Sequence, residues 1–450
     1  MNDFKFPEDF MWGAACSAFQ LEGGRFEGGK TDSINEHNFY DPRTMNNYAD
    51  RIPPDVGADF YHRYPEDIAL MKELGIDSFR FSFAWSRICP DVTDKPNQAG
   101  IDFYNKVIDT LIENGITPFF DLFHSGLPQW IEENGGIKSP DFVDHFVNYA
   151  RICFENFGDR VKYWSTVNEP LLTVYGSYAN GRFKPYEKSV PYAMEAVTNM
   201  IIAHFRSVKI LRELWPDAKI GAVHCQSGIY PAHPDDEGDI KESIMGCHFM
   251  NLLLEPMAMG KYPDILIDEI RDAITDDMVK RIKEEFVPMD FHGANIYATN
   301  FTQSKENTEK YGPFSSGYPK DAYGFTAYPR GLYDRVKFLN DRYPDLDIYI
   351  TENGYTYKRD VSNLDVSGEL HDDERIEYIK NHIKECENAV KDGLRLKGYY
   401  YWSALDCWEG VKGYGFPMGL VAVNFDTKER FKRDSFYYYQ KVIKDNCIND

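Results

Sequence analysis

Eight short runs of β-branched and aromatic residues alternate with amphipathic helical patterns along the 450-residue chain, and this alternation constrains the fold most. The runs lie at residues 10–16, 77–83, 117–123, 161–167, 219–225, 290–296, 347–351 and 397–402. Such alternation is typical of βα units around a parallel sheet. Eight strands favour an α/β fold with a single closed (β/α)8 TIM barrel, and a doubly wound open sheet is the alternative. Because such barrels run past 400 residues, we expect one catalytic domain over residues 1–450.

Local signals predict several helices between these runs. Pro65 is expected at the first position of a helix that ends at Gly75, because proline suits the first turn and glycine the C-terminal cap. A second helix is predicted between Ile101 and Gly115, and others over residues 372–389 and 434–442. Two stretches, residues 22–55 and 297–328, show neither the strand pattern nor the helix pattern. They are predicted to be long βα loops that form an active-site rim.

Charge and composition limit the classes of partner. The formal net charge is −22, which argues against nucleic acid and anionic membrane surfaces and is compatible with a neutral carbohydrate substrate. The first residues contain no apolar signal segment, and no run of 18 apolar residues occurs, so we predict a cytoplasmic protein with reduced thiols. The eight cysteines form no C-x-x-C pair, and no metal or organic cofactor is expected. Homo-oligomer formation is left open.

Polar side chains are concentrated at the ends of the predicted strands. They are Gln20, Arg80, His124, Asn168, Glu169, Asn295, Tyr297, Glu352 and Trp402. In a barrel the carboxyl ends of the strands meet at one mouth, so Glu169 and Glu352 would face one site. Two carboxylates among hydrogen-bonding groups and aromatic rings are what glycoside hydrolysis requires. Singly, each glutamate could instead belong to a helix cap or a turn.

The chain resembles family 1 glycoside hydrolases, the β-glucosidase family, over almost its full length. The segments that carry the resemblance are FMWGA at 10–14, QLEG at 20–23, HRYPED at 62–67, FRFS at 79–82, DFYN at 102–105, FGDRV at 157–161, TVNEP at 166–170, ITENG at 350–354, YWSALD at 401–406 and DSFY at 434–437. The NEP and TENG motifs in this order and spacing are highly specific. The resemblance implies a (β/α)8 barrel and hydrolysis of terminal β-D-glycosides by double displacement, with retention of configuration.

Residue roles follow from the same resemblance. Glu169, in NEP, would be the acid/base, and Glu352, in TENG, the nucleophile. Arg80, Asn295 and Tyr297 would support the nucleophile, with Arg80 and Tyr297 keeping it ionised and aimed. The substrate-binding residues would be Gln20, His124, Asn168, Tyr297, Trp402 and Glu409.

The sequence departs from the family pattern where two tryptophans are usual: Ser125 follows His124, and Gly410 follows Glu409. The glycone pocket is then either widened, or filled by Trp408 or by a tyrosine from a loop. A 6-phospho-β-glycosidase is the nearest alternative, since Lys412 and Tyr414 resemble a phosphate-binding pair, but Glu409 would repel phosphate. A non-catalytic sugar-binding protein on the same barrel is a further alternative.

Overall fold

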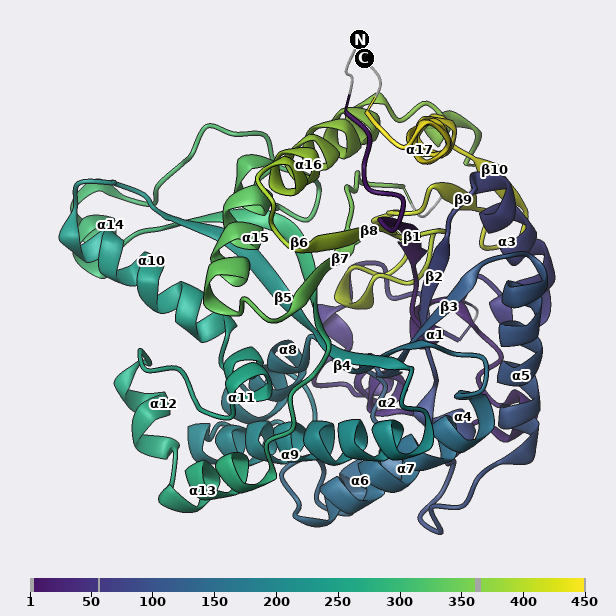
Figure 1. The fold of residues 1–450 in the computed structure, drawn as a ribbon, viewed down its shortest axis with the longest axis horizontal. Coiled ribbons are helices and arrows are strands. Elements are labelled where there is room, and N and C mark those ends of the chain that lie inside the picture. The colour runs from purple at the N-terminus through teal and green to yellow at the C-terminus, as the bar shows by residue number, and fades with distance from the viewer. Residues whose placement is uncertain (1–3, 56, 361–365, 449–450) are drawn as a thin grey trace.

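The structure is a computed structural model that describes residues 4–55, 57–360 and 366–448. Eight parallel strands form a closed barrel in sequence order, with β1 paired to β8, which confirms the predicted fold (Figure 1). The strands are β1 (Met11–Ala15), β2 (Ser78–Ser82), β3 (Thr117–Phe123), β4 (Tyr163–Asn168), β5 (Lys219–Pro231), β6 (Phe291–Thr302), β7 (Asp347–Asn353) and β8 (Leu396–Trp402).

Helices cover the outside of the barrel (Figure 1). The long ones that alternate with the strands are α3 (Phe60–Leu74), α5 (Gln98–Glu113), α7 (Asp141–Phe157), α9 (Val190–Leu214), α15 (Arg330–Arg342), α16 (Asp373–Lys391) and α17 (Asp434–Asp445). The connections contain α1 (Ala18–Leu21), α2 (Ile34–Tyr40), α4 (Trp85–Ile88), α6 (Gln129–Glu133), α8 (Pro170–Val174), α10 (Glu237–Met250), α11 (Leu254–Met259), α12 (Asp268–Ala273), α13 (Asp276–Glu285) and α14 (Lys305–Tyr311). A two-stranded antiparallel sheet, β9 (Val421–Val423) with β10 (Arg430–Lys432), follows β8.

The predicted start of the first long helix is wrong. Helix α3 begins at Phe60, so Pro65 lies inside it rather than at its first position. The additional turn is held by the loop after β1, because the Tyr61 amide donates to the Glu22 carbonyl (3.0 Å). Tertiary hydrogen bonds thus override a local preference that is typical of helix starts.

The two segments predicted as loops contain regular structure. Helix α2 lies within 22–55 and begins with a capping box, in which the Ser33 side chain accepts from the backbone and Glu36 accepts from the Ser33 amide (2.8 Å). In the second segment β6 continues to Thr302 and α14 follows. Both segments still form part of the connections at the carboxyl ends of the strands, because they follow β1 and the barrel portion of β6.

Aromatic rings fill the amino-terminal half of the barrel. Phe119 contacts Tyr163, Phe291 and Tyr400 with ring centroids 5.5–6.1 Å apart, and Tyr349 contacts Phe291 at 5.4 Å. These five rings come from five different strands and form a closed floor, as inward layers of side chains do in such barrels. Gly13 is required beside it, since a Cβ there would lie 2.2 Å from the Tyr400 ring. Part of the aromatic composition therefore serves the core.

Candidate active site

The structure brings the residues predicted from strand ends together at the open end of the barrel. Arg80 lies on β2, Asn295 and Tyr297 on β6, Glu352 on β7 and Trp402 on β8. Asn168 ends β4, while His124 and Glu169 directly follow β3 and β4. Hydrogen bonds join most of these side chains into one network.

Glu352 is buried and held by two donors. Its Oε1 accepts from Arg80 Nη1 (2.7 Å), and its Oε2 accepts from the Tyr297 hydroxyl (2.7 Å). Its side chain is only 5% exposed. A buried carboxylate is stable only when it is paired and hydrogen-bonded, and these two contacts hold the Glu352 carboxyl in a fixed orientation.

Arg80 is itself oriented by Asp121, a residue that the sequence analysis missed. The Arg80 Nη2 and Nε atoms donate to the two oxygens of Asp121 (2.6 and 3.1 Å), and Nη2 also donates to Asn168 Oδ1 (2.7 Å). His124 Nδ1 lies 3.2 Å from Asp121 Oδ2, and Asn168 Nδ2 donates to His124 Nε2 (3.1 Å). These contacts orient the His124 ring, with Nδ1 directed at the Asp121 carboxylate and Nε2 directed at the Asn168 amide.

Glu169 lies in a different environment from Glu352. It precedes α8 in a left-handed conformation (φ 45°), which non-glycine residues adopt only when the surroundings enforce it. Asn295 Nδ2 donates to its Oε1 (2.9 Å), and Thr351 in turn orients Asn295 through a 2.8 Å bond. Burial, followed by the negative charge of Glu352, raises the pKa of Glu169 to about 7. At neutral pH this carboxyl can therefore hold a proton.

Glu409 forms a third polar centre at the edge of the site. Its Oε1 accepts from Trp402 Nε1 (3.2 Å) and from the Cys407 thiol (3.2 Å), and its Oε2 accepts from the Tyr323 hydroxyl (3.2 Å). Burial raises the pKa of Glu409 to about 7. Tyr323 was not predicted as a site residue, because it lies in the long connection between α14 and α15, where no strand end marks it.

A cavity of about 610 Å³ opens at this end of the barrel. Gln20, His124, Asn168, Glu169 and Glu409 contribute to its wall, together with apolar residues that include Leu172 and Phe249. Gln20 is held in place by Ser17, which donates to its Oε1 (2.7 Å), and by its own bond to the Trp408 carbonyl (2.9 Å). The rings of His124 and Trp402 are stacked with centroids 5.6 Å apart. The cavity is large enough for a sugar and part of an attached group.

The positions of the two missing tryptophans differ in how far they are filled. Ser125 accepts a 3.2 Å hydrogen bond from Asn35, so this position is occupied by a polar contact. A Cβ on Gly410 would meet no atom within 4 Å. Trp408 is buried and stacked on Tyr48 (5.6 Å). The sequence left open whether the pocket is widened or filled by Trp408 or a loop tyrosine. The loop residue Tyr323 does reach Glu409, but it leaves the space at Gly410 open.

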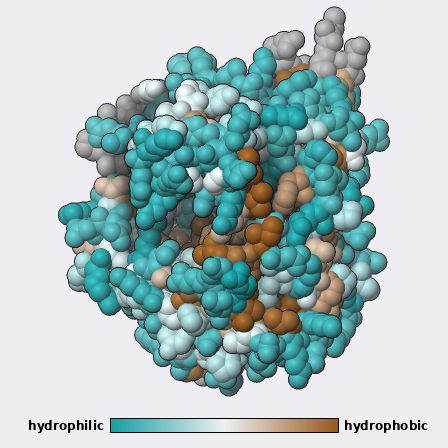
Figure 2. Space-filling view, turned by 90° about the vertical axis from the view of Figure 1, so that its left-hand side faces the viewer, coloured by the Kyte–Doolittle hydropathy of each residue, from teal (hydrophilic) through white to brown (hydrophobic). Residues whose placement is uncertain are grey.

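A second surface cavity, about 700 Å³ in volume, lies between α10 and α12 and is lined by apolar residues such as Ile244, Ile265 and Ile267. Figure 2 shows this side of the molecule, where apolar residues gather among hydrophilic ones. None of the predicted site residues lines this cavity. The barrel mouth is therefore the candidate active site.

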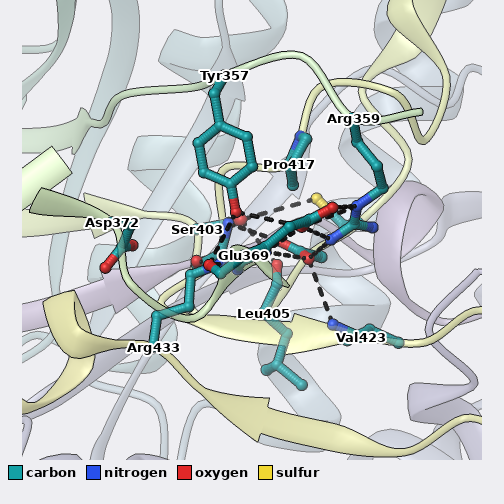
Figure 3. A network of polar contacts seen from close by, with 12 residues as sticks. Tyr357, Arg359, Glu369, Asp372, Ser403, Leu405, Pro417, Val423 and Arg433 are labelled. Atoms are coloured by element: carbon teal, nitrogen blue, oxygen red, sulfur yellow. Dashed lines mark hydrogen bonds and ion pairs between the residues drawn. The ribbon is translucent and has the colours of Figure 1, made fainter. Parts of the chain in front are cut away.

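A buried ion cluster anchors the segment that carries Glu409 (Figure 3). Asp406 accepts from Arg359 Nη2 (2.6 Å) and from Arg433 Nη1 and Nη2 (both 2.9 Å), and Glu369 bridges the same two arginines. Backbone amides of Gly419 (2.9 Å) and Val423 (3.3 Å) also donate to Asp406. The cluster ties the chain after β8 to α17 and to the segment after β7.

Replacing Asp406 by asparagine should destabilise the fold by about 3 kcal/mol, because two buried guanidinium groups lose their shared anion. Burial alone would raise the pKa of Asp406, but Arg433 and Arg359 hold it below its usual range. The stabilisation is therefore present above pH 4 and is lost as the pH falls, so the difference between wild type and variant should shrink in acid. Thermal unfolding should show a Tm decrease of about 3 °C at neutral pH. Asp426→Asn, at an exposed position, is the matched control, and an equal decrease in both variants would contradict this role.

Within the described part of the chain, no helix is long and apolar enough to cross a membrane. The same residues contain no group of three histidine, cysteine or acidic side chains with metal-binding geometry.

Comparison with known proteins identifies the family. The glycosyl hydrolase family 1 model matches residues 2–448. A 1,4-β-D-glucan glucohydrolase from Thermotoga neapolitana is 38% identical over 99% of this chain and 100% of its own. A 6-phospho-β-glucosidase from Bacillus subtilis is 34% identical over 98% of each chain. The solved family 1 β-glucosidase from Thermotoga maritima superimposes with a TM-score of 0.92 at 36% identity, covering 99% of this chain and 100% of that one. The chain therefore belongs to glycosyl hydrolase family 1, which confirms the resemblance and makes it an O-glycosyl hydrolase.

Proposed function

We propose that the protein is a retaining β-glycosidase in which Glu352 is the nucleophile and Glu169 the acid/base. The observation that carries the proposal is the contrast between the two carboxyls. Glu352 is bonded to a guanidinium and a phenol, whereas Glu169 has a pKa raised to about 7. A carboxyl that can hold a proton at neutral pH is suited to the acid role, and a carboxylate oriented by a cation and a hydroxyl donor is suited to nucleophilic attack.

In the first step the proton of Glu169 passes to the glycosidic oxygen while an oxygen of Glu352 attacks the anomeric carbon. The bond from this carbon to the leaving oxygen breaks, an alcohol departs, and a glycosyl ester of Glu352 remains. Esterification removes the negative charge of Glu352, so the pKa of Glu169 falls and the residue stays ionised.

In the second step Glu169 accepts a proton from water, whose oxygen attacks the anomeric carbon. The ester bond to Glu352 breaks and the carboxylate is restored. Two successive inversions leave the β configuration unchanged. A sugar hydroxyl in place of water would give transglycosylation by the same route.

The remaining predicted residues fit supporting roles. Asn168 can bond the sugar 2-hydroxyl, a contact that strengthens in the transition state. We assign Gln20, His124 and Glu409 to the other hydroxyls and the Trp402 ring to stacking on the apolar face of the sugar. Asn295 was expected to support Glu352, but its amide donates to Glu169 Oε1 (2.9 Å) and to Asn168 Oδ1 (3.0 Å), so we assign it to orienting the acid/base instead.

Stereochemistry and covalent trapping test the proposal directly. Proton NMR of the first product of a nitrophenyl β-glycoside should show the β anomer. A 2-deoxy-2-fluoro glycoside with a good leaving group should label the peptide that contains Glu352. An α anomer as first product, or a label on another residue, would refute the assignment.

Tyr297→Phe should lower kcat by about 10²-fold, because Glu352 loses the 2.7 Å hydrogen bond that orients it. The size of the loss should be similar for good and poor leaving groups, since Glu169 is unaffected. Steady-state kinetics with two aryl glycosides measure this. Tyr355→Phe is the control, because that hydroxyl bonds the exposed Glu374 (2.9 Å), and a comparable loss there would contradict the prediction.

The contacts favour a glycone without phosphate. The ionised form of Glu409 would repel a phosphate group, and the Tyr414 hydroxyl already donates to the Pro53 carbonyl (3.1 Å) and accepts from the Gly57 amide (3.2 Å). Lys412 lies over the rings of Tyr323 and Phe416, with its Nζ 5.3 and 4.8 Å from their centroids. The Tyr414 hydroxyl is thus already bonded to the backbone, and Lys412 packs against aromatic rings at the edge of the site.

We further propose a glycone pocket wider than is usual in the family, on the basis of the open space at Gly410. Gly410→Trp should then lower kcat/KM for disaccharide glycosides about tenfold more than for nitrophenyl β-glucoside, because only larger glycones reach that space. A panel of nitrophenyl β-glucoside, galactoside, fucoside, xyloside and disaccharide glycosides, together with the 6-phosphates of the glucoside and the galactoside, measures the effect. Gly393→Trp is the matched control, because Gly393 also has a positive φ and a Cβ there would meet no atom within 4 Å. Equal losses on small and large glycones would argue against the wider pocket.

Some predictions extend beyond the site. We propose that residues 1–450 form a single catalytic domain, which the family match over residues 2–448 supports. Cytoplasmic location, formation of homo-oligomers and the lack of a nucleic-acid partner stay predictions. A catalytically idle sugar-binding role is disfavoured, because both glutamates and their supporting contacts are present.

A further inference from the structure

Arg335, on α15, is a buried cation without an ion-pair partner among the described residues. Its side chain is almost fully enclosed, with 2% of the residue exposed. Its Nε donates to Gln226 Oε1 and its Nη2 donates to Asn251 Oδ1, both at 2.6 Å. Both acceptors are neutral amides. A buried charge that is not balanced by an opposite charge is strongly destabilising, so this arrangement needs a further group.

Three buried donors around this guanidinium have no hydrogen-bond partner among the described protein atoms. They are Arg335 Nη1, Gln226 Nε2 and Asn251 Nδ2. Each amide nitrogen is bonded to the carbon whose oxygen accepts from Arg335, so all three donors lie in the immediate surroundings of this guanidinium. Gln226 and Asn251 are 1% and 0% exposed. Native proteins rarely leave such groups unpaired, and here they are concentrated at one place.

Two buried histidines adjoin the cluster and add donors but no charge. His224 on β5 and His292 on β6 have ring centroids 5.3 Å apart, and neither ring nitrogen of either residue has a partner among the described protein atoms. Burial lowers the pKa of both, to about 3 for His224, and the nearby charge of Arg335 lowers that of His292 further. Both rings are therefore neutral, and Arg335 carries the charge.

We propose that Arg335, Gln226 and Asn251 form a buried binding site for a small monovalent anion of the halide type. Water alone would satisfy the donors but would leave the positive charge unbalanced. A divalent anion would leave one buried negative charge unbalanced in place of the positive charge of Arg335. The site lies where α15 packs against β5, and the neighbouring residue Cys225 pairs in register with Asn295 (Figure 1). A bound anion would therefore brace the two strands that support the candidate active site.

Crystallography with bromide is the direct test. Crystals of the wild-type protein grown in sodium bromide, and measured at the bromine absorption edge, should show an anomalous peak within hydrogen-bond distance of Arg335 Nη1. Ordinary density for water at this position without an anomalous peak would overturn the proposal, and so would a peak that appears only on the surface.

Thermal unfolding gives an independent test in solution. Wild-type Tm should be about 2 °C higher in sodium bromide than in sodium gluconate of equal ionic strength, because a ligand bound only by the folded state stabilises it. Arg335→Met should lose this difference. Arg395→Met should keep it, because Arg395 is half-exposed and pairs with Asp347 (2.9 Å). If Arg335→Met does not fold, the wild-type comparison still decides, since equal Tm values in the two salts refute the site.

Discussion

Glu352→Gln should reduce turnover of every glycoside by about 10⁴-fold or more, whatever the leaving group. The change keeps the size of the side chain but removes the negative charge that attacks the anomeric carbon, so no glycosyl ester can form. The amide can still accept from Arg80 or Tyr297, which bond Glu352 at 2.7 Å, so we expect a folded protein. Single-turnover and steady-state assays with an activated aryl glycoside measure the loss.

The control for this experiment is Glu374→Gln, the same chemical change at an exposed position on α16. It should retain wild-type kcat/KM. Thermal unfolding of both variants should exclude loss of fold as the cause. Turnover by Glu352→Gln at more than a few per cent of wild type would remove the nucleophile assignment.

Glu169→Gln should separate substrates by their leaving groups. Glycosides of poorly acidic alcohols need a proton and should lose about 10³-fold or more in kcat/KM, within the range of general acid catalysis or beyond it. A dinitrophenyl glycoside needs no proton and should lose far less, because its ester-forming step stays intact. An equal loss on both substrates would contradict the acid/base role.

The same variant should change the pH dependence. Wild-type kcat/KM should fall above a pH of about 7, the value to which burial and Glu352 raise the pKa of Glu169, because the acid must start protonated. Glu169→Gln should lack this basic limb. Since the folded pKa exceeds the unfolded value, the protonated form stabilises the wild type below pH 4.5, and this stabilisation is lost as the pH rises through 7. The variant should therefore gain Tm relative to wild type at alkaline pH.

The sequence predicts the barrel well, because eight buried strands produce a strong and repeated pattern. It also predicts Glu169 and Glu352, because strand ends and specific motifs coincide at these residues. Asp121 is missed because an acid in the middle of an apolar strand has no local marker; only the closed barrel reveals that it faces Arg80. Tyr323 is missed because a long connection brings it to Glu409.

The errors in secondary structure have equally local causes. Helix α2 is short and polar, so it lacks hydrophobic periodicity, although Ser33 and Glu36 have the spacing of a capping box. The first turn of α3 depends on contact with Glu22, which no local pattern contains. The sequence alone thus does not reveal which side chains on distant strands and connections pair with one another.

The layer of aromatic rings around Phe119 closes the amino-terminal end of the barrel, so the candidate active site opens to solvent only at the carboxyl end of the strands. Whatever enters must leave by the same route, so the released sugar can depart only after the aglycone has cleared its path. Under the proposed mechanism cleavage would therefore release the terminal glycone, and this product would compete with the next substrate molecule for the same space.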